Sequence, residues 1–211
     1  MKIIGLGYKA RNGKDSVANA MIETYGDDIR IKKVSFASTL KREVENMAKA
    51  IGSMASLALL FDRAAAANGK AVTYDPYPPM DDPDCPSGKQ RSMLQWYGSD
   101  FWRKIDTDHW VKALALQMCK ADEDVFIVTD VRFTNEADWI RSKGGLMIKV
   151  TCPDLPDNLV LKNHMAHISE TQLDSYKFDH EIWARFGDMK CLSAQACGLF
   201  QNFVLGENQY E

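Results

Sequence analysis

Residues 3–16 read Ile-Ile-Gly-Leu-Gly-Tyr-Lys-Ala-Arg-Asn-Gly-Lys-Asp-Ser, an apolar stretch that runs into a loop ending in Gly13-Lys14. The apolar residues predict a strand over Lys2–Leu6, and the residues after the loop predict a helix over 14–25. A strand, a glycine-bounded loop and a helix start are typical of sites that hold nucleotide phosphates, because backbone N–H groups and a lysine point at the anion. The segment therefore predicts a phosphate-binding loop.

The spacing of this loop departs from the common Gly-x-x-x-x-Gly-Lys-Ser/Thr pattern. Gly7 lies one residue too far upstream, Tyr8 stands where a glycine is expected, and Asp15 separates the lysine from Ser16. The alternative is a glycine-rich turn between a strand and an ordinary helix, with Lys14 in solvent. We favour the phosphate-binding interpretation because the loop follows a strand and opens a helix.

Bulk properties predict one compact, soluble domain over residues 1–211, with 45% apolar and 26% charged residues. The net charge of −3 argues against a broad nucleic-acid-binding surface, which needs a basic excess. The five cysteines are odd in number and form no Cys-x-x-Cys pair, which argues against a disulfide framework or a zinc site and favours a reducing compartment. We see no signal peptide or membrane span, and we expect a cytoplasmic protein without a membrane partner.

Strand-like and helix-like segments alternate along the chain. Further strands are expected at Ile31–Phe36, Val125–Thr129, Leu146–Thr151 and His180–Trp183, and further helices at Ser38–Ile51, Asn135–Lys143 and Met189–Val204. This alternation predicts an α/β fold with a parallel sheet of about five strands and helices on both faces. Ligands of such sheets bind at the carboxyl ends of the strands, where the glycine loop lies.

The middle of the chain breaks this alternation. A helix is expected over Ala55–Ala67, and the segment 73–86 holds five of the seven prolines. So many prolines exclude a regular helix or a central strand. We therefore expect an exposed excursion beside a helical insertion over about 52–110.

Three side chains are candidates for phosphoryl-transfer chemistry. Lys14 would clamp the β- and γ-phosphates. Asp130 ends a buried strand and would hold a Mg²⁺-bound water or act as a general base; a helix or turn cap is the alternative. Arg132 would hold a phosphate through paired hydrogen bonds, the alternative being a surface salt bridge. Near Lys14, Asp15 and Ser16 are candidate metal neighbours, although Asp15 could simply be a favourable charge at a helix start.

A second cluster lies at Lys89–Trp110, where Arg91, Arg103 and Gln95 stand among acids and aromatic residues. Such a set could bind a second anionic, planar substrate by charge, stacking and an amide contact. For most of the aromatics, packing in the core is the stronger expectation. His164 and His167 are a weak metal signal; contact with substrate, or capping and packing, are the alternatives.

Taken together, these segments resemble the bacteriophage deoxynucleoside monophosphate kinases. The resemblance rests on an ordered set: Gly13-Lys14-Asp15-Ser16, Ser35-Phe36-Ala37 with Leu40-Lys41, Arg91 and Leu94 through Asp100 to Arg103, Thr129 through Phe133 with Asn135-Glu136, and His167 through Glu170. The Gly-Lys-Asp-Ser variant is itself typical of that family. The extra loop residue and the proline-rich segment 73–86 depart from it.

The resemblance implies a P-loop kinase fold, ATP and Mg²⁺ as cofactors, and transfer of a phosphoryl group to a deoxynucleoside 5′-monophosphate. Because a kinase must avoid hydrolysing ATP, we also expect a lid within about 154–170. A homodimer is compatible with this interpretation. The expected catalytic residues are Lys14, Asp130 and Arg132, and the expected metal neighbours are Asp15, Ser16 and Asp130. The expected nucleotide contacts are Lys9, Arg11, Asn12, Gly13, Lys14, Asp15 and Ser16. The expected substrate contacts are Phe36, Lys41, Arg91, Gln95, Trp96, Asp100, Arg103, Arg132, Glu136, His167 and Glu170.

Two other functions stay open at this point. One is a different small-molecule P-loop kinase, such as one acting on dephospho-coenzyme A. The other is a nucleotide-binding regulatory or assembly module without transfer activity. The basic and polar second cluster argues against the latter, because a pure sensor needs a single phosphate site. A phage origin would place the enzyme in the cytoplasm of an infected cell.

Overall fold

The computed structural model describes residues 1–50, 94, 96–156 and 168–206. The predicted helix over Ala55–Ala67, the proline-rich segment 73–86 and most of the predicted lid lie outside these residues. The chain forms two compact units, Met1–Ser35 with Ala115–Glu211, and Phe36–Leu114. The predicted phosphate-binding loop belongs to the first unit.

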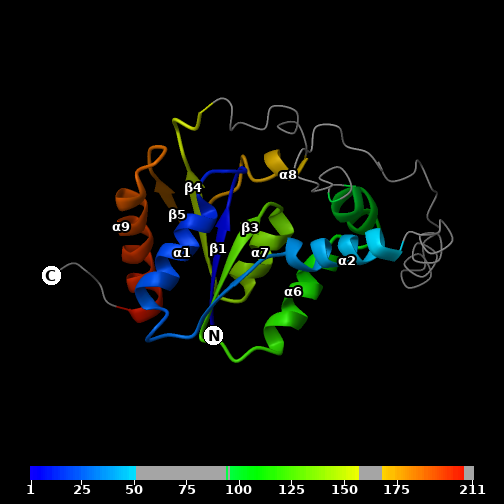
Figure 1. Cartoon of the computed structure of the whole chain (residues 1–211), viewed down its shortest axis with the longest axis horizontal. Coiled ribbons are helices and arrows are strands. Elements are labelled where there is room, and N and C mark those ends of the chain that lie inside the picture. Colours follow the sequence, from blue (N-terminus) through cyan, green and yellow to red (C-terminus); the bar gives the residue numbers. More distant parts are fainter. Residues whose placement is uncertain (51–93, 95, 157–167, 207–211) are drawn as a thin grey trace. The chain divides into compact units, whose positions relative to one another are not determined.

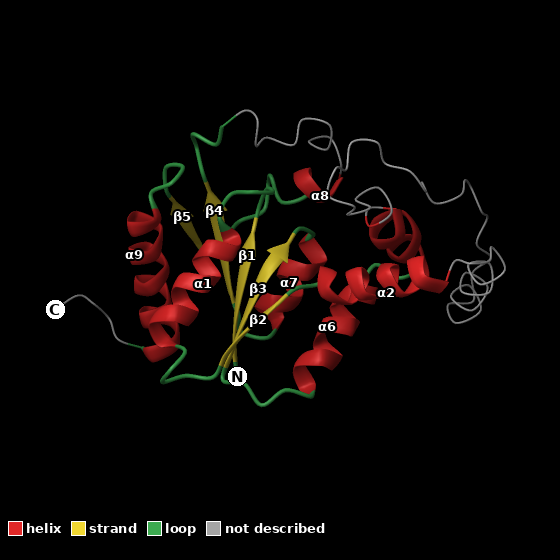
Figure 2. Ribbon diagram, viewed as in Figure 1, coloured by secondary structure: helices red, strands yellow, loops and turns green. Residues whose placement is uncertain are grey.

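Five parallel strands form the sheet of the first unit, in the order β2-β3-β1-β4-β5 (Figures 1 and 2). Their bounds are β1 Lys2–Gly7, β2 Ile31–Val34, β3 Val125–Val131, β4 Leu146–Thr151 and β5 His180–Trp183. Strand β1 pairs with β3 on one side and with β4 on the other, and all four pairings are parallel. The predicted α/β fold with a five-stranded parallel sheet is confirmed, and its P-loop kinase-like character agrees with this strand order.

Helices cover both faces of the sheet. Successive side chains of β1 point to opposite faces, so they pack against different helices. Ile4 and Leu6 belong to a buried cluster with residues of α1 (Lys14–Tyr25) and α9 (Met189–Phe200), and these two helices pack on each other. Gly5 faces the other way, where its missing side chain leaves room for Met147 and Ile140. Ile140 belongs to α7 (Thr134–Ser142), and α9 continues into a short π-helix, η4 (Gln201–Leu205).

The end of α7 shows why two consecutive glycines stand there. Gly144 has a φ of 70°, and its N–H donates to the carbonyl of Arg141 at 2.9 Å. The N–H of Gly145 donates to the carbonyl of Ile140 at 3.0 Å. These bonds satisfy carbonyls at the helix end, so the two glycines cap α7.

The second unit contains α2 (Ala37–Ala50), the π-helix η1 (Trp96–Trp102), α5 (Arg103–Ile105) and the first part of α6 (His109–Cys119). Tyr97, Phe101 and Trp110 are buried in it, so these aromatics pack in the core, as expected for most of the cluster. The Trp110 indole donates to the carbonyl of Gly98 at 2.9 Å, and the Tyr97 hydroxyl donates to Glu43 at 3.0 Å. A Cβ on Gly98 would lie 2.8 Å from a methyl carbon of Leu40, so the glycine lets α2 and η1 approach closely.

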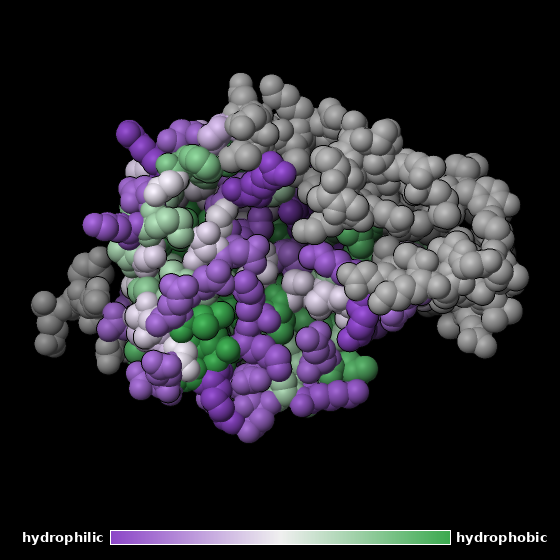
Figure 3. Space-filling view, in the orientation of Figure 1, coloured by the Kyte–Doolittle hydropathy of each residue, from purple (hydrophilic) through white to green (hydrophobic). Residues whose placement is uncertain are grey.

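The hydropathy of the surface agrees with the share of charged residues in the sequence, 26%. The face drawn in Figure 3 is largely hydrophilic over the described chain, with smaller hydrophobic areas between. Across the residues that the structure describes, no helix combines the length and the hydropathy needed to cross a bilayer. Cys119, Cys152, Cys191 and Cys197 are free thiols.

Replacing Gly145 with Ala should destabilise the first unit. The added Cβ would lie 2.8 Å from the carbonyl oxygen of Ile140 and 2.9 Å from that of Ile3, and backbone atoms give way poorly. We expect a loss of about 1–3 kcal/mol in the free energy of unfolding, measured by urea denaturation. The matched control is Gly198→Ala within α9, where nothing lies within 4 Å of the new Cβ. Gly198→Ala should raise the free energy of unfolding by about 0.5–1 kcal/mol, because alanine favours a helix more than glycine does. Equal effects of the two substitutions would contradict the close packing around Gly145.

Candidate active site

The loop between β1 and α1, residues 8–13, has an unusual backbone. Tyr8, Arg11 and Gly13 have φ values of 93°, 61° and 88°. Glycine adopts this left-handed region at little cost, whereas Tyr8 and Arg11 are strained there. Tyr8 stands where the common pattern has a glycine, and its backbone lies in the region that glycine favours. Contacts around the loop must therefore hold this conformation.

Asn12 provides one of these contacts. Its Oδ1 accepts a hydrogen bond from the N–H of Cys152, the residue after β4, at 2.8 Å. Its Nδ2 donates to the carbonyl of Ala10 at 2.9 Å. Asn12 thus ties the loop to the carboxyl end of the neighbouring strand. The predicted contact between Asn12 and a nucleotide stays a prediction.

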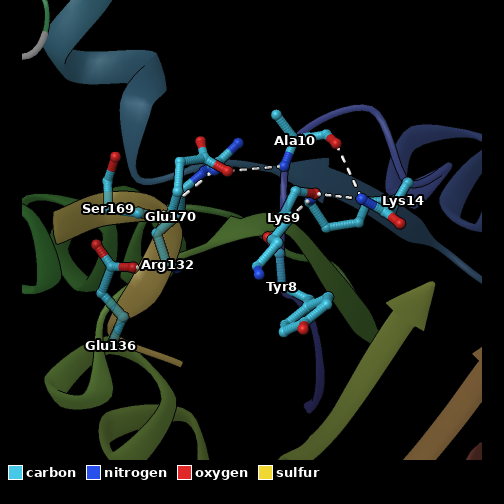
Figure 4. Close-up of polar contacts among 9 residues, drawn as sticks. Tyr8, Lys9, Ala10, Lys14, Arg132, Glu136, Ser169 and Glu170 are labelled. Atoms are coloured by element: carbon cyan, nitrogen blue, oxygen red, sulfur yellow. Dashed lines mark hydrogen bonds and ion pairs between the residues drawn. The ribbon is translucent and has the colours of Figure 1, made fainter. Parts of the chain in front are cut away.

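Lys14 lies inside the turn, with 7% of its surface exposed. Its Nζ donates to the carbonyl of Tyr8 at 3.1 Å and to the carbonyl of Lys9 (Figure 4). Burial, with the positive charge of Arg132, lowers the pKa of Lys14 from its ordinary 10.5 to about 7, against the opposing charges of Glu170, Asp130 and Asp15. The alternative in which Lys14 is a solvated surface lysine is therefore wrong.

Arg132 follows β3, and the turn that carries it is held by Glu136. The Glu136 carboxylate is 1% exposed and accepts hydrogen bonds from the N–H groups of Arg132, at 2.8 Å, and Phe133, at 3.1 Å. These two hydrogen bonds fix the backbone of the turn after β3. The predicted substrate contact of Glu136 stays a prediction, whereas its role in fixing the backbone of Arg132 is visible.

Glu170 joins the loop to Arg132. It belongs to the short helix α8 (Ile168–Thr171). One carboxylate oxygen accepts a hydrogen bond from the N–H of Ala10 at 3.0 Å, and the other forms an ion pair with the guanidinium of Arg132 (Figure 4). The Arg132 and Glu170 side chains are 23% and 14% exposed, so this ion pair is largely shielded from water. Arg132 is therefore paired, but with a partner inside the predicted site and not on the outer surface.

Two further lysines contact the ring of Tyr8. Nζ of Lys9 lies 5.1 Å and Nζ of Lys149 lies 4.7 Å from the centroid of this ring. Lys9 also pairs with Asp174 at 3.4 Å. These cation–π contacts stabilise Tyr8 in its strained conformation. Arg11 is exposed.

The candidate metal neighbours differ in their surroundings. Asp130 is the second-to-last residue of β3, and its negative charge raises the pKa of Lys14, against the effect of burial. Ser16 lies in the first turn of α1 and is partly buried. Asp15 is exposed and pairs with Lys33 at 3.4 Å, which agrees with the alternative of a favourable charge at the helix start.

The donor set fits Mg²⁺ bound together with phosphates. Within the part of the chain that the structure describes, no three His, Cys, Asp or Glu side chains gather closely enough to hold a metal by themselves. Mg²⁺ prefers oxygen ligands and usually takes one or two from the protein and the rest from phosphates and water. The hydroxyl of Ser16 and the carboxylate of Asp130 are ligands of this type.

The other predicted substrate residues lie in the second unit or outside the described chain. Phe36 is 4% exposed and Lys41 is exposed on α2. Arg103 is partly buried, and its guanidinium donates to the carbonyl of Thr107 at 3.3 Å. Trp96 and Asp100 lie on η1. Arg91, Gln95, His164 and His167 lie outside the described residues.

Sequence reasoning missed how the loop is held. The N–H of Ala10, the amide of Asn12 and the ring of Tyr8 each have a specific partner. Those partners lie 160 residues away for Ala10 and 140 residues away for Asn12. No local pattern signals such pairs; the unusual Tyr8 was the one visible hint that the loop needs support.

Comparison with known proteins adds to this geometry. Residues 89–185 match the family model described as "Deoxynucleotide monophosphate kinase". A protein of Acanthamoeba polyphaga mimivirus named "Putative deoxynucleotide monophosphate kinase" is 33% identical over an alignment of 102 residues, and the match covers 41% of this chain and 48% of that protein. The "Deoxynucleoside-5'-monophosphate kinase" of Escherichia phage T5 is 28% identical over 107 residues, which are 50% of this chain and 43% of that protein. The chain thus matches less than half of the length of either relative.

The matched residues include Arg132, Glu136 and Glu170, which meet at the site, whereas the loop with Lys14 precedes them. The loop and the turn after β3 are brought together by the sheet, in which β1 and β3 are neighbours. The resemblance predicted from the sequence is therefore confirmed: this chain is similar to the deoxynucleotide monophosphate kinases, and the family model matches it over residues 89–185.

Proposed function

We propose that this protein transfers the γ-phosphoryl group of ATP to a deoxynucleoside 5′-monophosphate and produces the diphosphate. The observation that carries the proposal is the meeting of Lys14, Arg132 and the N–H of Ala10 at the carboxyl edge of the sheet. A buried lysine, a guanidinium and a loop amide are the groups that bind phosphates. The names of the similar viral and phage proteins supply the class of acceptor.

On the donor side, the loop and the start of α1 would hold the polyphosphate of ATP. The first N–H groups of a helix have no partner within it, and the helix dipole favours an anion there. Lys14 would give up its bonds to the carbonyls of Tyr8 and Lys9 for the phosphates. Lys9, Arg11 and Asn12 remain proposed contacts.

Mg²⁺, when bound, would neutralise charge on the phosphates. Ser16 and Asp130 would hold it, with Asp15 nearby. Arg132 would keep the acceptor phosphate close to ATP in spite of their mutual repulsion. In the proposed reaction an oxygen of the acceptor phosphate attacks the γ-phosphorus, and the bond to ADP breaks in line with it. Such a reaction needs positioning and charge neutralisation and no covalent enzyme intermediate.

On the acceptor side, Lys41 and Arg91 would bind the phosphate, and Gln95 with a neighbouring aromatic would read the base. Phe36, Trp96, Asp100, Arg103, Glu136, His167 and Glu170 complete the proposed set. A segment within 154–170 would close over the reactants and exclude water, because a kinase must avoid hydrolysing ATP. The viral and phage relatives suggest that the reaction takes place in the cytoplasm of an infected cell.

Replacing Lys14 with Ala should lower turnover by about 100-fold or more, since a charge on the transferring group loses its buried partner. The measurement is ADP release coupled to NADH oxidation, with circular dichroism to confirm folding. The matched control is Lys32→Ala, whose ammonium pairs with Glu123 at 3.1 Å. It should change turnover less than about twofold. Near-normal turnover of the Lys14 variant would remove the central assignment.

A panel of acceptors tests the substrate class. With ATP and Mg²⁺, the four deoxynucleoside monophosphates should yield ADP and a deoxynucleoside diphosphate. Phosphorylation of dephospho-coenzyme A and of none of the deoxynucleotides would instead favour the other small-molecule kinase. ATP binding without ADP formation under any acceptor would favour a non-catalytic nucleotide-binding module.

The lowered pKa of Lys14 predicts a specific dependence of stability on pH. Between about 7 and 10.5 the unfolded chain binds more protons at this position than the folded one, so the folded state gains stability as the pH rises. Below that window both states are protonated and the full cost of the buried charge remains.

Lys14→Met should remove this dependence. Its stability relative to the wild type should therefore be highest at pH 6 and should fall by about 2 kcal/mol on going to pH 9. Urea unfolding at both pH values gives the difference, and Lys32→Met serves as the control. A stability difference that is the same at both values would show that Lys14 keeps its ordinary pKa.

A further inference from the structure

Glu170 is an acid that a hydrogen bond places on the main chain of the phosphate-binding loop. Its two oxygens point in different directions, one to the N–H of Ala10 and one to the guanidinium of Arg132 (Figure 4). Arg132 also donates to the carbonyl of Ser169, at 3.5 Å. The carboxylate is thus bound by a loop amide and an arginine at the same time.

An amide and an arginine are also the donors that a phosphate oxygen takes at such loops. A carboxylate and a phosphate both present two negatively charged oxygens on one edge. An N–H group has a single hydrogen and bonds well to one acceptor at a time. A phosphate that accepts from Ala10 therefore competes with Glu170 for this bond, and the two anions repel each other.

We propose that the Glu170 carboxylate occupies the position of a phosphate oxygen and competes with the polyphosphate for the N–H of Ala10 and for Arg132. The proposal rests on the proposed function and adds a feature to it. Binding of the nucleotide would displace Glu170 from the loop and transfer Arg132 from the carboxylate to a phosphoryl group. Glu170 would then balance the charge of two cations, Lys14 and Arg132, until the nucleotide arrives.

The chain after α8 limits the movement that this exchange requires. Leu173 is 4% exposed, and Asp174 pairs with Lys9. Further on, Asp179 pairs with Arg141 at 2.6 Å and accepts from the N–H of Met147 at 2.8 Å. Because this segment is fixed to the sheet, displacement needs a rotation of the Glu170 side chain and no unfolding of the segment.

The test is the affinity for inorganic tripolyphosphate, measured by isothermal titration calorimetry at constant ionic strength without Mg²⁺. Glu170→Gln and Glu170→Ala both remove the competing charge, so each should bind about tenfold tighter than the wild type, the change expected when a competing charged hydrogen bond is lost. Two variants are used so that the result does not depend on whether one of them folds. Circular dichroism checks the folding of both.

The matched control is Asp174→Asn. It removes one negative charge beside the loop, but this carboxylate contacts Nζ of Lys9 and no loop amide. It should change the affinity less than about twofold, as expected for an exposed charge. An equal gain in Asp174→Asn would mean that net charge alone is responsible and would overturn the proposal.

Unchanged or weaker binding in both Glu170 variants would also overturn it, because Glu170 would then be a fixed support of the site. This outcome differs from failure of the proposed function. In that case the wild type and both Glu170 variants would bind no tripolyphosphate, and Lys14→Ala would behave like the wild type. Both proposals would fall together on that result.

Discussion

The burial of one ammonium group at the start of α1 is the constraint on which the site depends. Lys14 is almost inaccessible to water, and the carbonyls of Tyr8 and Lys9 accept its hydrogen bonds. An unpaired buried charge would be very costly, so the loop must remain wrapped around the lysine. This requirement explains why the strained backbone of Tyr8 and Arg11 persists. The shape of the loop follows from the lysine at least as much as from its glycines.

The charges around Lys14 act on its pKa in opposite directions. Arg132 makes the protonated lysine less favourable, while Glu170 and Asp130 favour it. The Glu136 carboxylate accepts a hydrogen bond from the backbone N–H of Arg132, and Glu170 pairs with its guanidinium. The turn after β3 therefore presents a preorganised cation next to the loop after β1. Such preorganisation is what phosphoryl transfer asks of a protein.

The fold was largely predictable, because it depends on local patterns. The apolar run Val125–Thr129 and the alternation of strands and helices predicted the sheet. The sequence also indicated that Lys14, Asp130 and Arg132 would lie near one another, because the loop after β1 and the end of β3 share one edge of the sheet, and the structure places them so. Their catalytic roles stay predictions. Three features could not be read from the sequence: the tie of Asn12 to Cys152, the support of Arg132 by Glu136, and the bond of Glu170 to Ala10. Two of these join positions far apart in the chain, and the third depends on how a turn closes.

The binding of a polyphosphate by the loop after β1 is tested most directly by the response of the loop amides to such an anion. In two-dimensional ¹H–¹⁵N NMR spectra of the labelled protein, titration with tripolyphosphate should shift the amide resonances of Ala10 through Ser16 more than all others. This result is expected if the main-chain N–H groups after β1 hold the phosphates. Resonances of these residues that do not move while others do would show that the turn does not bind the anion, and would contradict the account.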